Sequence, residues 1–210
     1  MEKTNPVLTR GTDPATARGE RTRRKLLSAA EGEFGEKGFH NASISSITQR
    51  AGVAQGTFYL YYRSKEEIFR ALVEHMNRTM RRHLSEAIEA ARNRAEAERI
   101  GLEAFLHFCR EHQDLYRIVM ESQFVDPEAH RWYFQTLASG YAERLRAAQA
   151  RGEARLGNPY TQALALIGVA FFMGQRSLIW GEDAPPDEEA LATATALIQH
   201  GLVPDGGPDA

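Results

Sequence analysis

The sequence predicts an all-α protein. Between its two ends, apolar residues recur three and four positions apart, which is the period of an α-helix with one buried face. No segment shows the sustained alternation of apolar and polar residues that a half-buried strand needs. The apolar fraction of 42% in 210 residues is large enough for a hydrophobic core. We therefore expect about nine helices, in a three-helix N-terminal domain followed by a larger helical domain.

The first helix is predicted from its apolar face and from the glycine that should end it. Leu26, Ala30 and Phe34 share one face of this helix. Gly38 follows them, and glycine readily takes the left-handed conformation that closes a helix. We therefore expect the helix to end near Gly38.

Capping residues, prolines and glycines place the other helices. Ser43 supplies an N-cap oxygen for a short second helix that Gly52 ends. A third short helix is expected over residues 55–62, and the S-x-x-E pattern from Ser64 predicts the start of a long fourth one. Further helices are expected to begin at Pro127 and Pro159, each after an N-cap residue, and after Pro185-Pro186-Asp187. Further expected ends lie near Gly152, Gly181 and Gly201.

Composition divides the chain into four parts. Residues 1–19 lack apolar periodicity and are expected to form a flexible arm, as are residues 203–210 at the other end. Residues 20–66 should form the N-terminal domain and residues 67–202 the second domain. Residues 1–65 hold 11 Lys and Arg against 6 Asp and Glu, whereas the rest of the chain is acidic. Such asymmetry is typical of a basic region that binds a polyanion.

The sequence excludes several classes of protein. Cys109 is the single cysteine, so no disulfide forms within the chain. No apolar stretch at the N-terminus resembles a secretory signal. The longest apolar run, residues 163–173, is shorter than the roughly 18 residues that span a membrane. We expect a soluble cytoplasmic protein with no membrane partner.

The segment from Ser43 to Lys65 has the pattern of a DNA-reading helix-turn-helix. A helix that enters the major groove is packed on one side and carries groups for phosphates and base edges on the other. Phe58 and Tyr62 should face the core, which leaves an outward polar set. Its members offer amide, hydroxyl and ammonium groups, and they are Gln55, Gly56, Thr57, Tyr59, Tyr61 and Lys65.

Three stretches of the chain together resemble the TetR/AcrR family of transcriptional regulators. Residues 22–39 are similar to that family's first helix, residues 51–62 to its helix-turn-helix, and residues 64–72 to its fourth helix. The resemblance implies a homodimer that binds a palindromic site on double-stranded DNA. It also implies phosphate or base contacts from Ser43, Ser45, Gln55, Gly56, Thr57, Tyr59, Tyr61 and Lys65.

Two positions depart from the family pattern, and one basic cluster has two interpretations. Ala54 stands where a hydroxyl residue is common, so the recognition helix lacks a side-chain cap. Tyr62 stands where phenylalanine is usual. The basic residues before the first apolar face either contact DNA or form a solvated tail, and they are Arg18, Arg21, Arg23, Arg24 and Lys25.

The last two helices are candidates for a dimer interface. The helix from Pro159 to about Trp180 is apolar on nearly all sides, so it must be covered on more than one side. The resemblance implies that it pairs with a partner subunit in a four-helix bundle, and a buried central helix of a monomer is the alternative. The candidate interface residues are Leu164, Ile167, Gly168, Phe171, Phe172, Leu191, Thr195 and Ile198.

The middle helices, residues 97–151, are rich in aromatic side chains. Most of these side chains should be core, but the resemblance implies a small-molecule cavity among them. The candidate lining residues are Phe105, Cys109, Met120, Phe124, Trp132, Phe134, Tyr141 and Phe171. Their size and aromatic content favour a bulky apolar or amphipathic effector, with no cofactor.

An enzyme is the competing interpretation. Glu103, His107 and Glu111 recur every four residues, so they share a helix face that can hold a metal in a bundle. A polar stripe opposite Phe105 explains the same pattern without a metal. Di-metal bundles draw Glu-x-x-His pairs from more than one helix, and the sequence contains no such pair, no phosphate loop and no nucleophile elbow. We therefore expect a ligand-responsive repressor rather than an enzyme.

Overall fold

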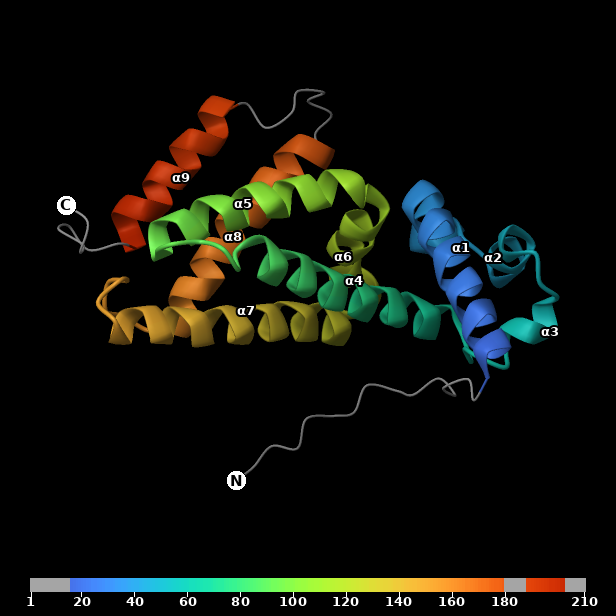
Figure 1. Ribbon diagram of the computed structural model, residues 1–210. Helices are drawn as coiled ribbons and strands as arrows, with labels where there is room; N and C mark the ends of the chain where they lie inside the picture. Colours follow the sequence, from blue (N-terminus) through green and yellow to red (C-terminus); the bar gives the residue numbers. More distant parts are fainter. Residues whose placement is uncertain (1–15, 180–187, 203–210) are drawn as a thin grey trace. The chain divides into compact units, whose positions relative to one another are not determined.

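The computed structural model describes residues 16–179 and 188–202 (Figure 1). Every element in these ranges is a helix, as the sequence predicts. No helix within them is long and apolar enough to cross a membrane. In chain order, the helices are α1 (Ala17–Asn41), α2 (Ile44–Ala51), α3 (Gln55–Phe58), α4 (Lys65–Ala87), α5 (Arg94–Glu111), α6 (Gln113–Val125), α7 (Pro127–Ala150), α8 (Pro159–Ile179) and α9 (Glu188–Leu202).

The chain forms two compact units whose boundary differs from the expected one at residue 66. Unit 1 contains residues 1–76 and 114–130, so α6 belongs with the N-terminal helices. Unit 2 contains residues 77–113 and 131–210. Helix α4 passes from one unit into the other as a single helix, because the boundary falls between Met76 and Asn77.

Helix α1 begins earlier than the sequence predicts. Thr16 caps it by accepting a hydrogen bond from the backbone N–H of Gly19 at 3.1 Å, so the expected arm, residues 1–19, overlaps the helix. Gly38 has a positive φ of 73°, which glycine adopts readily, but its ψ of 165° is extended, so the predicted left-handed helical conformation is wrong in ψ. The chain turns there before Phe39 and enters α2 after Ala42.

An aromatic cluster forms the core of unit 1. Phe34, Phe39 and Phe69 lie with ring centroids 5.1 to 5.7 Å apart, in tilted and edge-to-face arrangements. Phe58 and Tyr62 pack beside each other, with ring centroids 5.8 Å apart, and both are buried. The inward face predicted for the short helices is therefore confirmed at these two positions.

Polar contacts hold α6 against α1 and α4 within unit 1. The carboxylate of Glu121 accepts a hydrogen bond from the backbone N–H of Phe39, at 2.9 Å to Oε1 and 3.0 Å to Oε2. Arg70 of α4 donates to Asp126, which follows α6, at 2.6 Å. Asp126 also caps α7 by accepting from the N–H of Ala129. The segment 114–130 is thus a structural part of the N-terminal unit.

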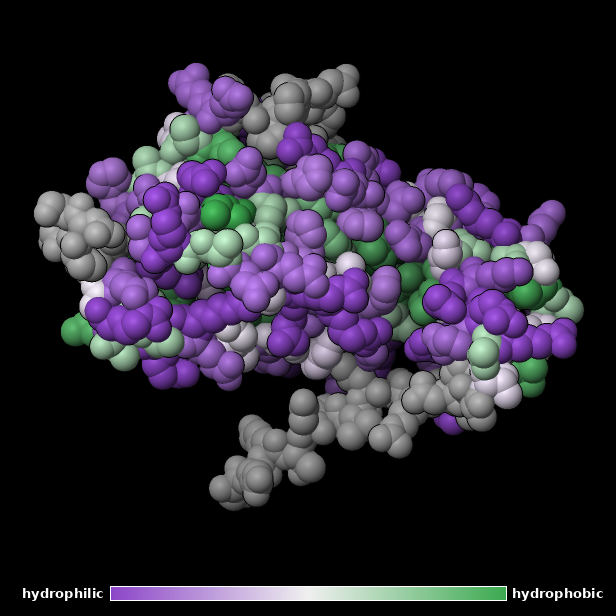
Figure 2. All heavy atoms as spheres, viewed as in Figure 1, coloured by the Kyte–Doolittle hydropathy of each residue, from purple (hydrophilic) through white to green (hydrophobic). Residues whose placement is uncertain are grey.

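Unit 2 packs the C-terminal part of α4 with α5, α7, α8 and α9. Asn77 donates to the backbone carbonyl of Tyr133 at 3.0 Å, which joins α4 to α7 in the buried interior. Gln199 of α9 donates to the carbonyl of Ala95 in α5 at 3.0 Å. The face shown in Figure 2 is mostly hydrophilic, with small separate apolar groups.

Most predicted helix ends are confirmed, and several parts of the prediction lie outside the described residues. Helices α7 and α8 begin at Pro127 and Pro159 as expected, and Gly152 turns the chain after α7 with a φ of 76°. Helix α9 runs through Gly201, so the predicted end there is wrong by one residue. Residues 1–15 of the expected arm, Trp180, Gly181, the segment 185–187 and the tail 203–210 lie outside the described residues.

Candidate DNA-binding surface and effector cavity

Ser43 fixes the start of α2 through a reciprocal cap. Its hydroxyl accepts a hydrogen bond from the backbone N–H of Ser46 at 3.0 Å, and the Ser46 hydroxyl accepts from the N–H of Ser43 at 3.1 Å. Ser43 and Ser45 are both exposed. The start of α2 therefore presents hydroxyl groups to solvent, which is where a phosphate contact from this helix is expected.

Helix α3 is shorter than predicted. It ends at Phe58 rather than near Tyr62, and its N-cap residue Ala54 makes no side-chain hydrogen bond, as the sequence implies. The chain continues in a tight turn in which the N–H of Leu60 donates to the carbonyl of Thr57 at 3.3 Å. One regular turn of helix therefore carries Gln55, and the non-helical turn after it carries Tyr59.

The predicted outward set divides by exposure. Gln55, Gly56 and Tyr59 are exposed, whereas Thr57 and Tyr61 are half-buried. The sequence did not single out Leu60, which is 67% exposed beside Tyr59. An exposed leucine next to the recognition helix can make apolar contact with a thymine methyl group. Leu60 lies in the turn after α3 rather than in a regular helix, so helical periodicity could not predict that its side chain is exposed.

Lys65 is held by the protein itself. Its ammonium group donates to the backbone carbonyls of Phe39 at 2.7 Å and Ala42 at 2.8 Å. The same nitrogen lies 4.3 Å from the centroid of the Phe39 ring, in cation–π range. Lys65 therefore stabilises the segment between α1 and α2, and a phosphate contact from its remaining N–H stays a prediction.

Gly56 gives a direct test of this surface. Nothing lies within 4 Å of an added Cβ at Gly56, and its φ is not positive, so the fold does not require glycine there. We expect Gly56→Ala to keep or slightly raise thermal stability, because alanine favours a helix by up to about 1 kcal/mol. We also expect weaker DNA binding, because the methyl group separates the backbone from the DNA.

Gly52→Ala is the matched control. Gly52 has a φ of 65° at the end of α2, where a side chain costs about 1–2 kcal/mol. This variant should melt at a lower temperature while its folded fraction keeps its DNA affinity. Melting curves and fluorescence anisotropy with labelled DNA measure the two effects. Unchanged affinity in Gly56→Ala would contradict the predicted close approach.

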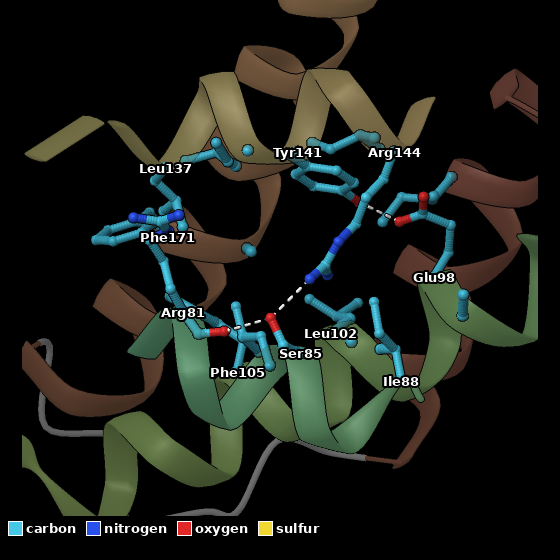
Figure 3. Close-up of a pocket in the computed structure, with 18 of the residues that line it drawn as sticks. Arg81, Ser85, Ile88, Glu98, Leu102, Phe105, Leu137, Tyr141, Arg144 and Phe171 are labelled. Carbon is cyan, nitrogen blue, oxygen red and sulfur yellow. Dashed lines mark hydrogen bonds between the residues drawn. The ribbon is translucent and has the colours of Figure 1, made fainter. Parts of the chain in front are cut away.

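Unit 2 encloses a cavity of about 420 Å³. It lies among α4, α5, α7, α8 and α9, and Figure 3 shows labelled lining residues from the first four of these helices. Its volume is within the range of small-molecule sites. Three of the predicted lining residues, Phe105, Tyr141 and Phe171, do line it.

The other five predicted lining residues lie elsewhere. Met120 and Phe124 are in α6 and belong to unit 1, and Phe124 is 80% exposed. Cys109 is fully buried outside the lining, and burial raises the pKa of its thiol well above the usual value. Trp132 and Phe134 are also absent from the lining. These residues were selected because they are apolar and lie in the middle helices. The helical period could not show which other helix each side chain faces.

A buried polar network forms one wall of the cavity. Arg94 and Glu98, four residues apart on α5, form an ion pair, and the Tyr141 hydroxyl donates to the same carboxylate. The Arg94 guanidinium lies 5.3 Å from the centroid of the Tyr141 ring. Burial and the adjacent Glu98 raise the pKa of Tyr141 well above its usual value, so this phenol stays protonated. The sequence analysis did not select Arg94 or Glu98, because only the fold brings Tyr141 of α7 to this pair on α5.

The predicted dimer residues do not share one face. Ile167, Phe171, Thr195 and Ile198 are buried within unit 2, and all of these except Thr195 line the cavity. Leu164, Gly168 and Phe172 are exposed and lie four residues apart on α8. Leu191 is half-buried, and Leu197, which the sequence analysis did not select, is 68% exposed on α9. The buried four are therefore corrected to core and cavity residues.

The metal-site pattern is an exposed polar stripe. Glu103, His107 and Glu111 are all exposed. Glu103 pairs with Arg99 at 3.1 Å, and His107 lies 3.3 Å from Glu111. The described residues contain no group of three or more side chains able to hold a metal ion. The stripe therefore lends the enzyme interpretation no support.

Comparison with known proteins supports the resemblance. The model of the family "Bacterial regulatory proteins, tetR family" matches residues 26–72. The uncharacterized HTH-type transcriptional regulator YdgC of Bacillus subtilis is 32% identical over 201 residues, which cover 90% of this chain and 97% of YdgC.

Solved structures share the fold. GusR of Salmonella enterica matches with a TM-score of 0.74 and 21% identity, over 90% of this chain and 98% of GusR. A complex of SmeT with triclosan matches with a TM-score of 0.73 and 20% identity, over 88% of this chain and 93% of SmeT. Together with the helix-turn-helix and the full-length relative, they lead to one conclusion: the chain belongs to the TetR family of DNA-binding transcriptional regulators.

Proposed function

We propose that this regulator is a cytoplasmic homodimeric repressor that leaves a palindromic operator when a bulky apolar or amphipathic molecule binds the cavity in unit 2. The observation that carries the DNA contact is the exposed group Gln55, Gly56 and Tyr59 at α3. The fold does not require a glycine at Gly56, and an exposed glutamine can bond adenine in two places.

The effector part of the proposal rests on the cavity. Its apolar lining and volume suit a small organic ligand. Among structures of the same fold, SmeT was solved in complex with triclosan. The cavity residues Arg81 and Ser85 lie on α4, the helix that continues into unit 1. A ligand that binds more tightly to one position of α4 than to another would shift the DNA-binding equilibrium.

The dimer part rests on the outer face of α8. Leu164, Gly168 and Phe172 leave one side of this helix apolar and exposed, and Leu197 of α9 adds to it. Large exposed apolar residues grouped on one face are typical of an interface. Two recognition helices on one dimer would reach half-sites about 34–36 Å apart.

Charge on this face should prevent the dimer. Phe172 is 60% exposed, and we expect Phe172→Glu to yield a folded monomer with much weaker operator binding, because a buried unpaired carboxylate is costly. Phe124→Glu is the control, since Phe124 is 80% exposed on α6. Analytical ultracentrifugation gives the mass of each variant. A Phe172→Glu variant that remains dimeric would contradict this interface.

Selection from genomic DNA tests the repressor as a whole. We expect purified protein to enrich fragments that contain one palindromic sequence at moderate salt. Gln55→Ala should change the preferred bases rather than the salt dependence, because it removes a base contact and no charge. A failure to enrich any palindrome would contradict the proposed operator binding.

A further inference from the structure

The cavity has an apolar part and a cationic part. Phe105, Ile167 and Phe171 are buried in the apolar part, and the rings of Phe105 and Phe171 lie 4.9 Å apart between centroids. The other part is lined by exposed arginines of α4 and α7, which are Arg78, Arg81, Arg82 and Arg144. One small site therefore joins a hydrophobic wall to a basic rim.

Two of these arginines extend across the cavity in opposite directions. Arg144 of α7 donates to the hydroxyl of Ser85 on α4 at 2.6 Å, and Figure 3 shows its guanidinium reaching across the cavity. Arg81 of α4 approaches α7, since an added Cβ at Gly140 would lie 3.8 Å from Arg81 Nη2. Arg81 and Ser85 are one helical turn, about 5.4 Å, apart along α4, as are Gly140 and Arg144 along α7.

Two arginines of the rim, Arg81 and Arg144, are not neutralised by acids of the described residues, whereas Arg82 lies 4.0 Å from Glu86. Glu98 is the one carboxylate among the lining residues, and it already pairs with Arg94 and Tyr141. Within the part of the chain that the structure describes, neither Arg81 nor Arg144 forms an ion pair with a carboxylate. Guanidinium groups bind carboxylate and phosphate through paired charge-assisted hydrogen bonds. The rim is thus complementary to an anion.

We propose that the effector is an amphipathic anion whose carboxylate or phosphate group binds Arg81 and Arg144. Its aliphatic or aromatic tail lies against Phe105 and Phe171. When the ligand binds, the Arg144 guanidinium donates to the ligand's headgroup instead of to the Ser85 hydroxyl. A charged acceptor thus replaces a neutral one. This inference rests on the proposed effector site and adds the charge of the ligand to it.

Binding of matched small molecules tests the charge preference. Octanoate, octyl phosphate and 1-octanol carry tails of the same length and differ in their headgroups. We expect at least one of the two anions to bind at least about tenfold more tightly than 1-octanol, as measured by isothermal titration calorimetry. The tighter of the two anions identifies the headgroup. Affinity should rise about fourfold for each added methylene, from hexanoate to octanoate, because the tail is buried.

Single variants test the residues. Arg144→Met and Arg81→Met should each weaken binding of the preferred anion by about tenfold or more and leave 1-octanol within twofold. Arg146→Met is the matched control, because Arg146 is an exposed arginine of α7 outside the cavity lining. It should bind all three probes as the unchanged protein does. Melting curves verify that each variant is folded.

Three outcomes would overturn the inference. These are equal binding of 1-octanol and both anions, no binding of either anion, and loss of all three probes alike in Arg144→Met and Arg81→Met. None of them bears on operator binding, which is measured separately by selection from genomic DNA. Failure of the charge preference therefore leaves the proposed repressor standing.

Discussion

Replacement of Arg94 by methionine is expected to destabilise the protein by about 3–5 kcal/mol. Arg94 and Glu98 are both buried in the wall of the cavity, and their ion pair keeps each charge compensated. Methionine fills a similar volume but leaves the Glu98 carboxylate buried with only the Tyr141 hydroxyl as partner. Urea unfolding at fixed protein concentration measures the loss, because dimer formation would make stability depend on concentration.

A double variant separates lost charge compensation from lost packing. Arg94→Met with Glu98→Leu removes both charges, and replacement of a buried ion pair by apolar residues is often neutral or stabilising. We expect the double variant to recover most of the stability and to lack only the Tyr141 hydrogen bond, worth about 1 kcal/mol. If the double variant is as unstable as Arg94→Met, packing rather than charge explains the effect.

Truncation of Phe34 is expected to cost unit 1 about 3–5 kcal/mol. Phe34 is 2% exposed, and its ring contacts those of Phe39 and Phe69. Phe34→Ala leaves a cavity at the centre of this cluster, so α1 loses its ring contact with Phe69 of α4. We expect a lower melting temperature and loss of DNA binding at temperatures where the unchanged protein binds.

Phe124→Ala is the control for the loss of an aromatic ring. Phe124 is 80% exposed on α6, so its removal should change stability by no more than about 0.5 kcal/mol. Thermal melting followed by circular dichroism compares the two variants. Similar losses in both would show that the buried cluster is not what holds unit 1 together.

The sequence predicted those features that depend on a few neighbouring residues. The starts of α7 and α8 are set by Pro127 and Pro159, each preceded by a capping residue that acts within one turn. The positive φ at Gly38 is a conformation that glycine itself adopts readily. Such signals need no knowledge of the rest of the fold.

The sequence could not assign the faces of α8. This helix is apolar on nearly all sides, so its period does not separate the cavity face from the outer face. Ile167 and Phe171 face the cavity, while Gly168 and Phe172, each one residue later, are exposed. A shift of one residue along a helix turns a side chain by about a quarter of a circle. The predicted interface therefore mixed two faces.

The candidate cavity was only partly predictable for a similar reason. Phe105 and Tyr141 were selected as aromatic residues, but the sequence analysis did not select the arginines beside them. Their meaning depends on α4 and α7 lying side by side, which places Arg81 against Gly140 and Arg144 against Ser85. Contacts between residues some sixty positions apart leave no periodic trace in the sequence.

The attachment of α6 to the N-terminal helices limits how parts of this regulator can be exchanged with those of a relative. A fragment that stops at Met76 would lose Glu121 and Asp126, which leaves the Phe39 N–H and Arg70 without these acceptors. A chimera that joins residues 1–76 to the effector domain of a relative would lack the same two acceptors. Residues 114–130 must therefore be exchanged together with the DNA-binding helices. The part of the chain needed for operator recognition thus consists of two stretches that are separate in the sequence.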